Sequence, residues 1–544
     1  MTNQLLNFNE PYYAGVLLLE NNKTYGRTPN KKRLFYKCIP DNKQMQPILV
    51  PYELNIGFSK KYINKYILFR VDQIIADQLY GQIMNTLGDV NNLEVFYEYQ
   101  LYCKDVHMSI TELTSTTRIA LSKKTQDEYI TDILSDCRFK IQDRRKEYVI
   151  TIDPQNSVDF DDGFSIIPLQ SGIYKISVYI ANVYIWLEIL DLWSSFSNRI
   201  STIYLPDKRR TMLPPILSDT LCSLQEQQTR FAFTMDIIID ENGNILEEPR
   251  YCNSAIRVAK NYCYEESNLS KDLHYNLLYD MTQKIAKNTN SDSIIDSHDI
   301  VAFWMIQMNT YCSEYMVQHQ FGIFRSATIF KPTKNLIRLA VSHSSWSMTD
   351  KENQPDPLIK DQCMDPNTKR MIQLWNNSSG QYVLYSDNPT QLEHTIMNLK
   401  SYIHITSPIR RLVDLLNQMA MMRHLNCISE LSSNASAFLF KWLNDIDFIN
   451  ISTKNIRKVQ TECENLQTCM QNPDILEKVF EGIVFDKNVK SSDKIVYTIF
   501  LEKLKIMSKI TISHELDIYA KYNFKLYLFQ DEYNCKKKIR LHLI

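Results

Sequence analysis

A short segment carrying four carboxylates, placed directly after an apolar run, constrains the fold of this chain more than any other feature. The run, residues 148–152, reads as a buried strand, and the carboxylates follow at Asp153, Asp159, Asp161 and Asp162. At a separation of about 5 Å and an effective dielectric constant of about 20, each carboxylate pair repels by roughly 3 kcal/mol. A folded protein keeps such a cluster only where a cation compensates the charge. The sequence therefore predicts a strand that ends at a cation-binding loop.

The chemistry of this segment has two interpretations. Hard divalent ions such as Mg2+ take oxygen ligands and leave positions for water and phosphate oxygens. Two such ions can stabilise the attacking and leaving oxygens of a phosphodiester cleavage. A solvated Asp-rich turn or a calcium loop would have a similar sequence, so the segment alone leaves metal-dependent chemistry open.

Bulk composition narrows the class of protein. A length of 544 residues suggests two to four domains, and a hydrophobic content of 44% with 23% charged residues is ordinary for a globular protein. The net charge of -1 means that any site for a polyanion must be a local basic groove. Twelve cysteines without a C-x-x-C pair indicate reduced thiols, so we expect an intracellular, cytoplasmic protein.

Two segments bear on membranes and secretion. Residues 1–10 carry no basic stretch followed by an apolar one, so they do not resemble a signal peptide. The most apolar segment, residues 174–193, is interrupted by charged and polar side chains and does not resemble a membrane span. We therefore expect no membrane partner.

The pattern along the chain predicts a multidomain α+β protein. Residues 1–75 alternate short apolar runs with turn signals, which is typical of a small β-barrel, and residues 76–146 form a connecting region of strands and helices. Residues 147–475 mix strands and helices as an α/β catalytic domain would. Alternation returns over residues 476–544 and predicts a second barrel.

Basic and aromatic residues alternate in the first predicted barrel. Residues 31–33 are basic and precede Phe35 and Tyr36, while Lys60, Lys61 and Lys65 flank Tyr62 and Tyr66. Such interleaving suits a platform for a single-stranded nucleic acid. By pattern alone, a solvated strand face is the favoured interpretation.

A second candidate site lies far downstream, in residues 401–417. Ser407 is expected to cap a helix that starts with Pro408, which places Arg410 and Arg411 in the first turn. Cations are unfavourable at a helix N-terminus unless an anion such as a phosphate or carboxylate is nearby. The alternative is a structural pair between Arg410 and Asp414, four residues apart.

Together these segments resemble the RNB-domain exoribonucleases, the family of bacterial ribonucleases II and R and of the catalytic subunit of the eukaryotic exosome. The resemblance covers residues 80 to 425 and is weaker for the terminal barrels, where the family carries cold-shock and S1-type OB folds. The matching segments occur in the family's order: Thr151–Pro154, Asp159–Asp162, Ile203–Pro206, Met212–Pro214, Leu217–Ser218, Leu221–Leu224, Ser254–Ile256, Tyr264–Glu266 and Tyr402–Asn417.

The resemblance implies hydrolysis of single-stranded RNA from its 3′ end to nucleoside 5′-monophosphates, by a monomer that uses one or two Mg2+ ions, or Mn2+ in their place. It implies metal ligands at Asp153, Asp159, Asp161 and Asp162. It implies catalytic roles for Asp161, Asp162 and Arg410, and contacts with the RNA from Tyr204, Tyr264, Arg410 and Arg411.

The chain departs from the family at a few positions. The family has His and Asp where this sequence has Tyr179 and Asn182, a pair of Glu residues where it has Ala302 and Phe303, and Ala where it has Gly163. An impaired RNA-binding or partner-binding pseudo-enzyme is therefore the alternative to an active exoribonuclease. A phosphodiesterase acting on DNA or on a small nucleotide is a third hypothesis.

Overall fold

The computed structural model describes residues 12–54, 62–170, 172–289, 291, 294–327, 380–394, 397, 399–491, 494–518, 520–531 and 536–544. Residues 1–10 and the basic pair Lys60 and Lys61, on which expectations were placed, lie outside this part. The chain forms two compact units. One contains residues 1–108, 203–209 and 452–544, and the other contains residues 109–202 and 210–451.

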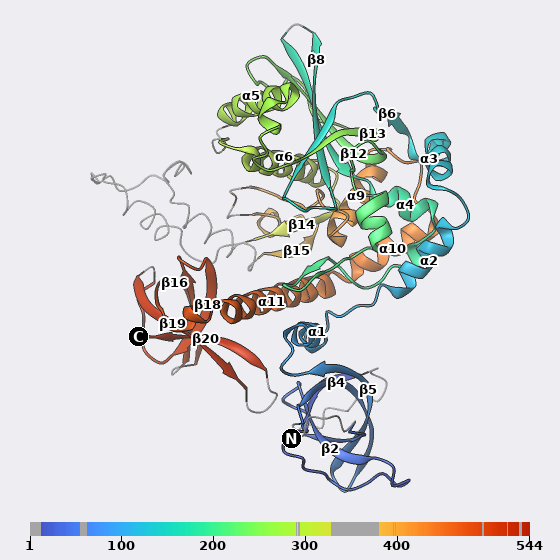
Figure 1. Ribbon diagram of the computed structural model, residues 1–544. Helices are drawn as coiled ribbons and strands as arrows, with labels where there is room; N and C mark the ends of the chain where they lie inside the picture. Colours follow the sequence, from blue (N-terminus) through green and yellow to red (C-terminus); the bar gives the residue numbers. More distant parts are fainter. Residues whose placement is uncertain are drawn as a thin grey trace. The chain divides into compact units, whose positions relative to one another are not determined.

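The first sheet of the first unit is a closed barrel with the strand order β1-β2-β3-β5-β4 (Figure 1). The strands are β1 (Tyr13–Leu17), β2 (Leu34–Pro40), β3 (Ile48–Tyr52), β4 (Lys65–Ile75) and β5 (Gln78–Asp89). The barrel is complete only with β5, so it runs to Asp89 and past the boundary at residue 75 that the sequence suggested. After β4 the chain makes a tight turn at Ala76 and Asp77 and returns as β5, which pairs with β4. A domain boundary drawn at this turn leaves β5 out of the barrel.

Gly15 explains how the barrel closes so tightly. A Cβ atom at this position would lie 2.7 Å from Cys38 Sγ and 2.8 Å from a ring carbon of Phe69. Both distances are shorter than any ordinary contact, so only glycine lets β1 pass between β2 and β4.

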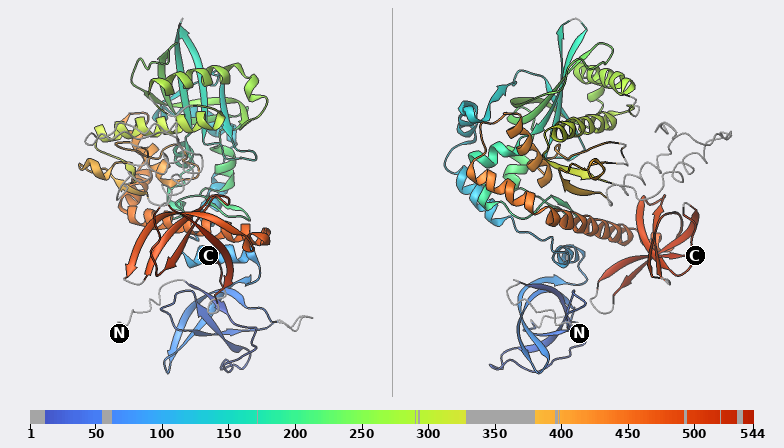
Figure 2. Two further views of the ribbon diagram at one scale, coloured as in Figure 1. Left: turned by 90° about the vertical axis from the view of Figure 1, so that its left-hand side faces the viewer. Right: turned by 180° about the vertical axis from the view of Figure 1, so that it is seen from behind.

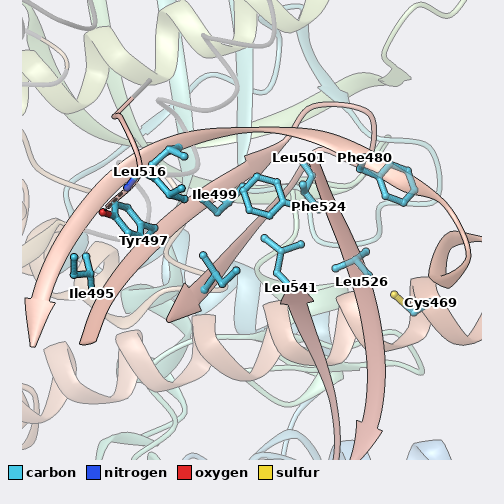
Figure 3. Packing of buried hydrophobic residues seen from close by; sticks show 12 residues of the cluster. Cys469, Phe480, Ile495, Tyr497, Ile499, Leu501, Leu516, Phe524, Leu526 and Leu541 are labelled. Carbon is cyan, nitrogen blue, oxygen red and sulfur yellow. Dashed lines mark hydrogen bonds between the residues drawn. The ribbon is translucent and has the colours of Figure 1, made fainter. Parts of the chain in front are cut away.

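The carboxy-terminal sheet of the same unit has the order β18-β17-β16-β19-β20. Its strands are β16 (Val479–Ser491), β17 (Lys494–Leu501), β18 (Ile506–Ile512), β19 (Lys521–Gln530) and β20 (Lys537–Leu543). Alternate residues of these strands share one apolar core, and Figure 3 shows Tyr497 in it, with its hydroxyl accepting a hydrogen bond of 2.9 Å from Leu516 N. The expectation of a mixed multidomain protein with barrels is confirmed at this level, and the finer OB-like classification remains a prediction.

The second unit is built on a six-stranded sheet with the order β12-β9-β8-β7-β13-β6, in which β13 also pairs with β12. Its strands are β6 (Ile141–Asp143), β7 (Val149–Asp153), β8 (Asp162–Gln170), β9 (Ile173–Ala181), β12 (Thr229–Asp240) and β13 (Arg250–Cys263). The long strand β13 shifts its register on β7 between Val258 and Lys260, as at a β-bulge.

Helices cover this sheet and continue beyond it. The helices α5 (Leu273–Asn288) and α6 (Ser297–Gln318) follow β13 and lie on one side of the sheet, as Figures 1 and 2 show together. The helices α4 (Val183–Ile189) and α9 (Leu412–His424) contact each other, and α9 also contacts the short strand β14 (Ile323–Ser326). The first turn of α6 is fixed by a capping box between Asp296 and Asp299.

The remaining helices are α1 (Leu93–Cys103), α2 (Thr111–Leu121), α3 (Gln126–Ser135), α10 (Ser433–Asn444) and α11 (Ile446–Gln471), and β15 (Gln381–Leu384) pairs with β14. No helix within the described ranges is long and apolar enough to cross a membrane.

A buried ion pair ties the residue that follows β6 to strand β12 of the same sheet. Arg144 is 8% exposed and donates two hydrogen bonds to Asp236, of 2.7 and 2.6 Å, while Ser177 Oγ donates a third of 2.6 Å. Burial alone would raise the pKa of Asp236, but the hydrogen bonds from Arg144 and Ser177 hold it below its ordinary value.

Arg144→Met should therefore destabilise the second unit by about 3–5 kcal/mol, because it leaves a buried carboxylate without its partner. Arg145→Met is the matched control, since the neighbouring Arg145–Asp143 pair is exposed and should contribute about 1 kcal/mol or less. Urea unfolding followed by circular dichroism measures both. The difference between the two variants should shrink as the pH falls below 3.8, where the lowered pKa of Asp236 no longer favours the folded state. Equal unfolding midpoints at neutral pH would contradict the assignment.

Candidate active site

Two adjacent strands bring the ends of the carboxylate segment together. β7 ends at Asp153, and the antiparallel β8 begins at Asp162, so the intervening loop leaves the sheet and returns to the same edge. The loop is anchored on β9, since Ala181 N donates to Asp161 O at 2.8 Å. The strand-to-loop geometry expected from the apolar run at residues 148–152 is confirmed.

Asp161 joins this loop to the distant arginine. Its side chain is 3% exposed, and its two oxygens accept hydrogen bonds from Arg410 Nε at 3.0 Å and from Ile409 N at 3.1 Å. The Arg410 side chain is 45% exposed, and its Nη2 also donates to Ser407 Oγ at 3.1 Å. A buried carboxylate thus orients a guanidinium whose outer part reaches solvent.

Burial and mutual repulsion raise the pKa of three carboxyls in the cluster. Burial raises the pKa of Asp153 to about 7, with further increases from Asp161 and Asp159, whereas Thr151 and Arg410 lower it. Burial raises the pKa of Asp161 to about 6 against the lowering effect of Arg410. The pKa of Asp162 is raised well above its ordinary value, first by burial and then by Asp153 and Asp161. These groups are therefore costly to keep charged without a compensating cation.

Two carboxylates of the loop have the free oxygens that a divalent cation would bind. Asp153 Oδ2 and Asp162 Oδ2 are buried carboxylate oxygens without a hydrogen-bond partner. Hard cations prefer such oxygens, so these two residues fit Mg2+. Within the described ranges, no three His, Cys, Asp or Glu side chains form a ready-made metal group. Asp161 is hydrogen-bonded to Arg410. Asp159 is partly buried, and its charge raises the pKa of Asp153 and of Asp161.

Arg411 is paired with a different carboxylate, that of Asp414. Its Nη2 donates to Asp414 Oδ1 at 2.9 Å, and this oxygen also accepts from Ser407 N at 2.8 Å. Asp414 is fully buried, and its salt bridge is with Arg411, whereas the alternative interpretation of the sequence paired it with Arg410.

The expected helix start at Ser407 is wrong, because α9 begins at Leu412 with Arg411 as its N-cap. The backbone of the preceding residues pairs with another segment: Thr202 N donates to Arg410 O at 2.9 Å, and Leu412 N donates to Ile200 O at 2.8 Å. This short antiparallel contact keeps the chain extended at Arg411, after a turn at residues 408–410, and delays the helix. Arg410 is therefore held by Asp161 rather than by a helix N-terminus.

Tyr264 lies beside the cluster. Its backbone N donates to Asp153 O at 3.0 Å, and the pKa of its phenol is raised by burial and by the charges of Asp162 and Asp153. Its ring stacks on His298 at the start of α6, with centroids 3.7 Å apart and an angle of 10° between planes. The structure thus brings together Asp153, Asp161, Asp162, Asp159, Arg410 and Tyr264 among the residues expected from the sequence.

Tyr204 is a separate case. It lies in β10 (Ile203–Tyr204), within the segment 203–209 that belongs to the unit of the terminal sheets, and it is 44% exposed. Its exposure suits contact with a ligand, and its role in binding RNA remains a prediction.

The residues that depart from the family pattern have structural partners. Tyr179 donates a hydrogen bond of 2.6 Å to Glu147 and shares another of 2.9 Å with Ser165. Asn182 caps α4 and donates to Asn253 Oδ1 at 3.1 Å. Both side chains are buried, and both are hydrogen-bonded within the sheet region.

Several residues around the loop gave no signal in the sequence analysis. Ser223 Oγ donates to Val158 O and accepts from Phe160 N, and Asn261 Nδ2 donates to Thr151 Oγ1 and Leu224 O. Ser223 falls in a motif segment, but nothing in the pattern distinguished its hydroxyl. An asparagine within a strand is unusual, and this was the one available signal for Asn261.

Comparisons with known proteins agree with this geometry. The family model described as the RNB domain matches residues 141–270 and 265–426. Ribonuclease R of Aquifex aeolicus is 37% identical over 127 residues, which are 23% of this chain and 18% of that protein. The first curated relatives are spanned over only 14% to 33% of their length.

Two solved structures have a similar fold. The structure of Mycoplasma genitalium RNase R in complex with ribose-methylated single-stranded RNA has a TM-score of 0.69 and 18% identity, covering 98% of this chain and 89% of that one. Yeast Ssd1, a pseudonuclease, has a TM-score of 0.60 and 14% identity, covering 95% of this chain and 66% of that one. Because the RNB model matches more than half of its residues, this chain belongs to the RNB-domain exoribonuclease family, as a distant member.

Proposed function

We propose that this chain is a Mg2+-dependent exoribonuclease that hydrolyses single-stranded RNA from the 3′ end and releases nucleoside 5′-monophosphates. The observation that carries the proposal is the contact between Asp161 and Arg410, which lie 249 residues apart in the sequence. It brings a guanidinium against a loop of buried carboxylates, and such a combination suits the cleavage of a phosphodiester.

Each residue of the site has a separate role in the proposed reaction. Asp153 and Asp162 would hold Mg2+, which when bound polarises a phosphate oxygen and activates water. Asp161 fixes Arg410 by its Nε, so that the exposed part of the guanidinium can bind the phosphate and stabilise the charge that develops on it. Tyr264, held beside Asp153 by its backbone, would contact the terminal nucleotide.

A pseudo-enzyme that binds RNA without cutting it is the second candidate. It draws on α6, where the family's paired Glu residues are replaced by the exposed Ala302 and by Phe303, which is 6% exposed. The likeness to the pseudonuclease Ssd1 shows only that the fold is compatible with loss of activity. The carboxylates and Arg410 remain, and for this reason we favour the active enzyme.

Asp162→Asn should abolish the release of labelled mononucleotides from end-labelled single-stranded RNA, with a loss of about 100-fold or more. The same change should raise the urea midpoint of the metal-free protein at neutral pH, because a carboxyl whose pKa is raised on folding makes the folded state less stable there. Asp280→Asn on the exposed face of α5 is the matched control and should change neither quantity. EDTA should reproduce the loss of activity. Wild-type activity in Asp162→Asn would refute the role of this carboxylate, and tight RNA binding without cleavage by the unsubstituted chain at any Mg2+ or Mn2+ concentration would favour the pseudo-enzyme.

The adjacent arginines should separate catalysis from stability. Arg410→Lys should lower kcat by about 100- to 1000-fold with a small change in unfolding midpoint, because a lysine keeps the charge but not the planar fork that binds phosphate. Arg411→Lys should mainly lower the unfolding midpoint, since its partner Asp414 is fully buried. Steady-state kinetics and urea unfolding measure the two effects, and the reverse pattern would contradict the assigned roles.

RNA binding by the inactive Asp162→Asn protein should fall steeply with salt, by about 1000-fold between roughly 50 and 200 mM if several phosphates are bound. A DNA oligomer of the same sequence should bind less well to this protein and be cut less well by the unsubstituted chain, because it lacks the 2′-OH. Fluorescence anisotropy measures binding, and the release of labelled mononucleotides measures cleavage. A flat salt response would argue against a long phosphate-binding channel, and faster cleavage of DNA would favour the hypothesis of a DNA phosphodiesterase.

A further inference from the structure

One side-chain amide connects the two ends of the carboxylate loop. Asn261 lies in β13, opposite Thr151 of β7 in the parallel pairing. Its Nδ2 donates to Thr151 Oγ1 at 2.8 Å and to Leu224 O at 3.0 Å, and its Oδ1 accepts from Glu226 N at 2.7 Å. All the hydrogen-bonding groups of this amide are therefore used within one small region.

The first branch leads to Asp153. Thr151 is fully buried, and its hydroxyl accepts from Asn261. Asp153 lies two residues further along β7 and pairs with Cys263, two residues beyond Asn261 on β13. Asn261 thus fixes β7 against β13 directly before the strand reaches Asp153.

The second branch leads to the other end of the loop. Leu224, whose carbonyl accepts from Asn261, donates its own N–H to Phe160 O at 3.0 Å. Ser223 Oγ accepts from Phe160 N at 3.0 Å and donates to Val158 O at 2.8 Å. Phe160 stands between Asp159 and Asp161, so these bonds hold the backbone that carries both carboxylates.

A buried arginine supports this second branch. Arg230 is 1% exposed, and it donates to Ser223 O at 2.8 Å, to Thr229 O at 2.9 Å and to Gln225 Oε1 at 2.9 Å. Its guanidinium joins residues 223, 225 and 229 by hydrogen bonds and so fixes the conformation of this segment. The segment that contacts Phe160 is therefore a rigid support.

We propose that Asn261 is a positioning residue that sets the spacing between Asp153 and the Asp159–Asp162 segment, and so the affinity of this loop for a divalent cation. This inference rests on the proposed function for its metal, and it concerns a residue that touches none of the reacting groups. Groups that orient metal ligands change metal affinity by about 10- to 100-fold when they are removed.

The test measures Mn2+ binding by the Asn261→Ala variant. Electron paramagnetic resonance detects the bound and free Mn2+ in samples of the folded, full-length chain without RNA. We expect the dissociation constant for Mn2+ to rise by about 10- to 100-fold. The matched control is Asn253→Ala, which removes an amide of the same strand that donates to Phe139 O and Cys427 O and accepts from Asn182. Both variants should lower the unfolding midpoint, but Asn253→Ala should bind Mn2+ like the unsubstituted chain.

If Asn261→Ala does not fold, Thr151→Val removes the same connection while keeping the shape of the side chain, and it should weaken Mn2+ binding in the same way. Unchanged Mn2+ affinity in the folded variant, or an equal loss in Asn253→Ala, would overturn the assignment. Weakened Mn2+ binding in a chain that cuts no RNA would support it and contradict the proposed function instead. Absence of Mn2+ binding in the unsubstituted chain would overturn both.

Discussion

A carboxylate that is 3% exposed holds a guanidinium that is 45% exposed, and the candidate site depends on this contact between Asp161 and Arg410. Burial on one side fixes the direction of the arginine, while exposure on the other leaves its outer part accessible. The backbone of the arginine is fixed as well, because residues 200–202 pair with residues 410–412. Contacts of both the side chain and the main chain therefore fix the position of the guanidinium. An arginine on an open surface has no such contacts and samples many positions.

The neighbouring carboxylates work against the stability of the fold. Asp162 is buried and Asp153 is partly buried, Asp153 raises the pKa of Asp162, and each of the two keeps one buried oxygen without a hydrogen bond. Proteins tolerate such arrangements where a ligand compensates them, and they concentrate at functional sites. The buried pair Arg144–Asp236 in the same unit is the opposite case. Both oxygens of this carboxylate accept hydrogen bonds from the arginine, and we expect the pair to stabilise the fold.

Much of this arrangement was predictable from the sequence, and the reason lies in local pattern. The apolar run before Asp153 predicted a strand that ends in the loop, and the family motifs related Arg410 to it across 249 residues. The start of α9 was not predictable, since Ser407 and Pro408 form a good local cap signal that pairing with residues 200–202 overrides. Asn261 acts only through contacts between strands, which no pattern along one strand records.

The register shift in β13 has a consequence for how such a chain can change. Between Val258 and Lys260 this strand holds one more residue than β7 does. Two residues of β13 therefore stand against one step of β7, and regular pairing resumes with Asn261 opposite Thr151. Loss of the extra residue would leave that pairing in register, but it would remove the local bend and twist that a bulge gives to a strand. With the bulge kept, a one-residue deletion between Lys260 and Cys263 would turn the residues that follow it to the opposite face of the sheet. The part of β13 that borders Asp153 is thus constrained in length as well as in composition.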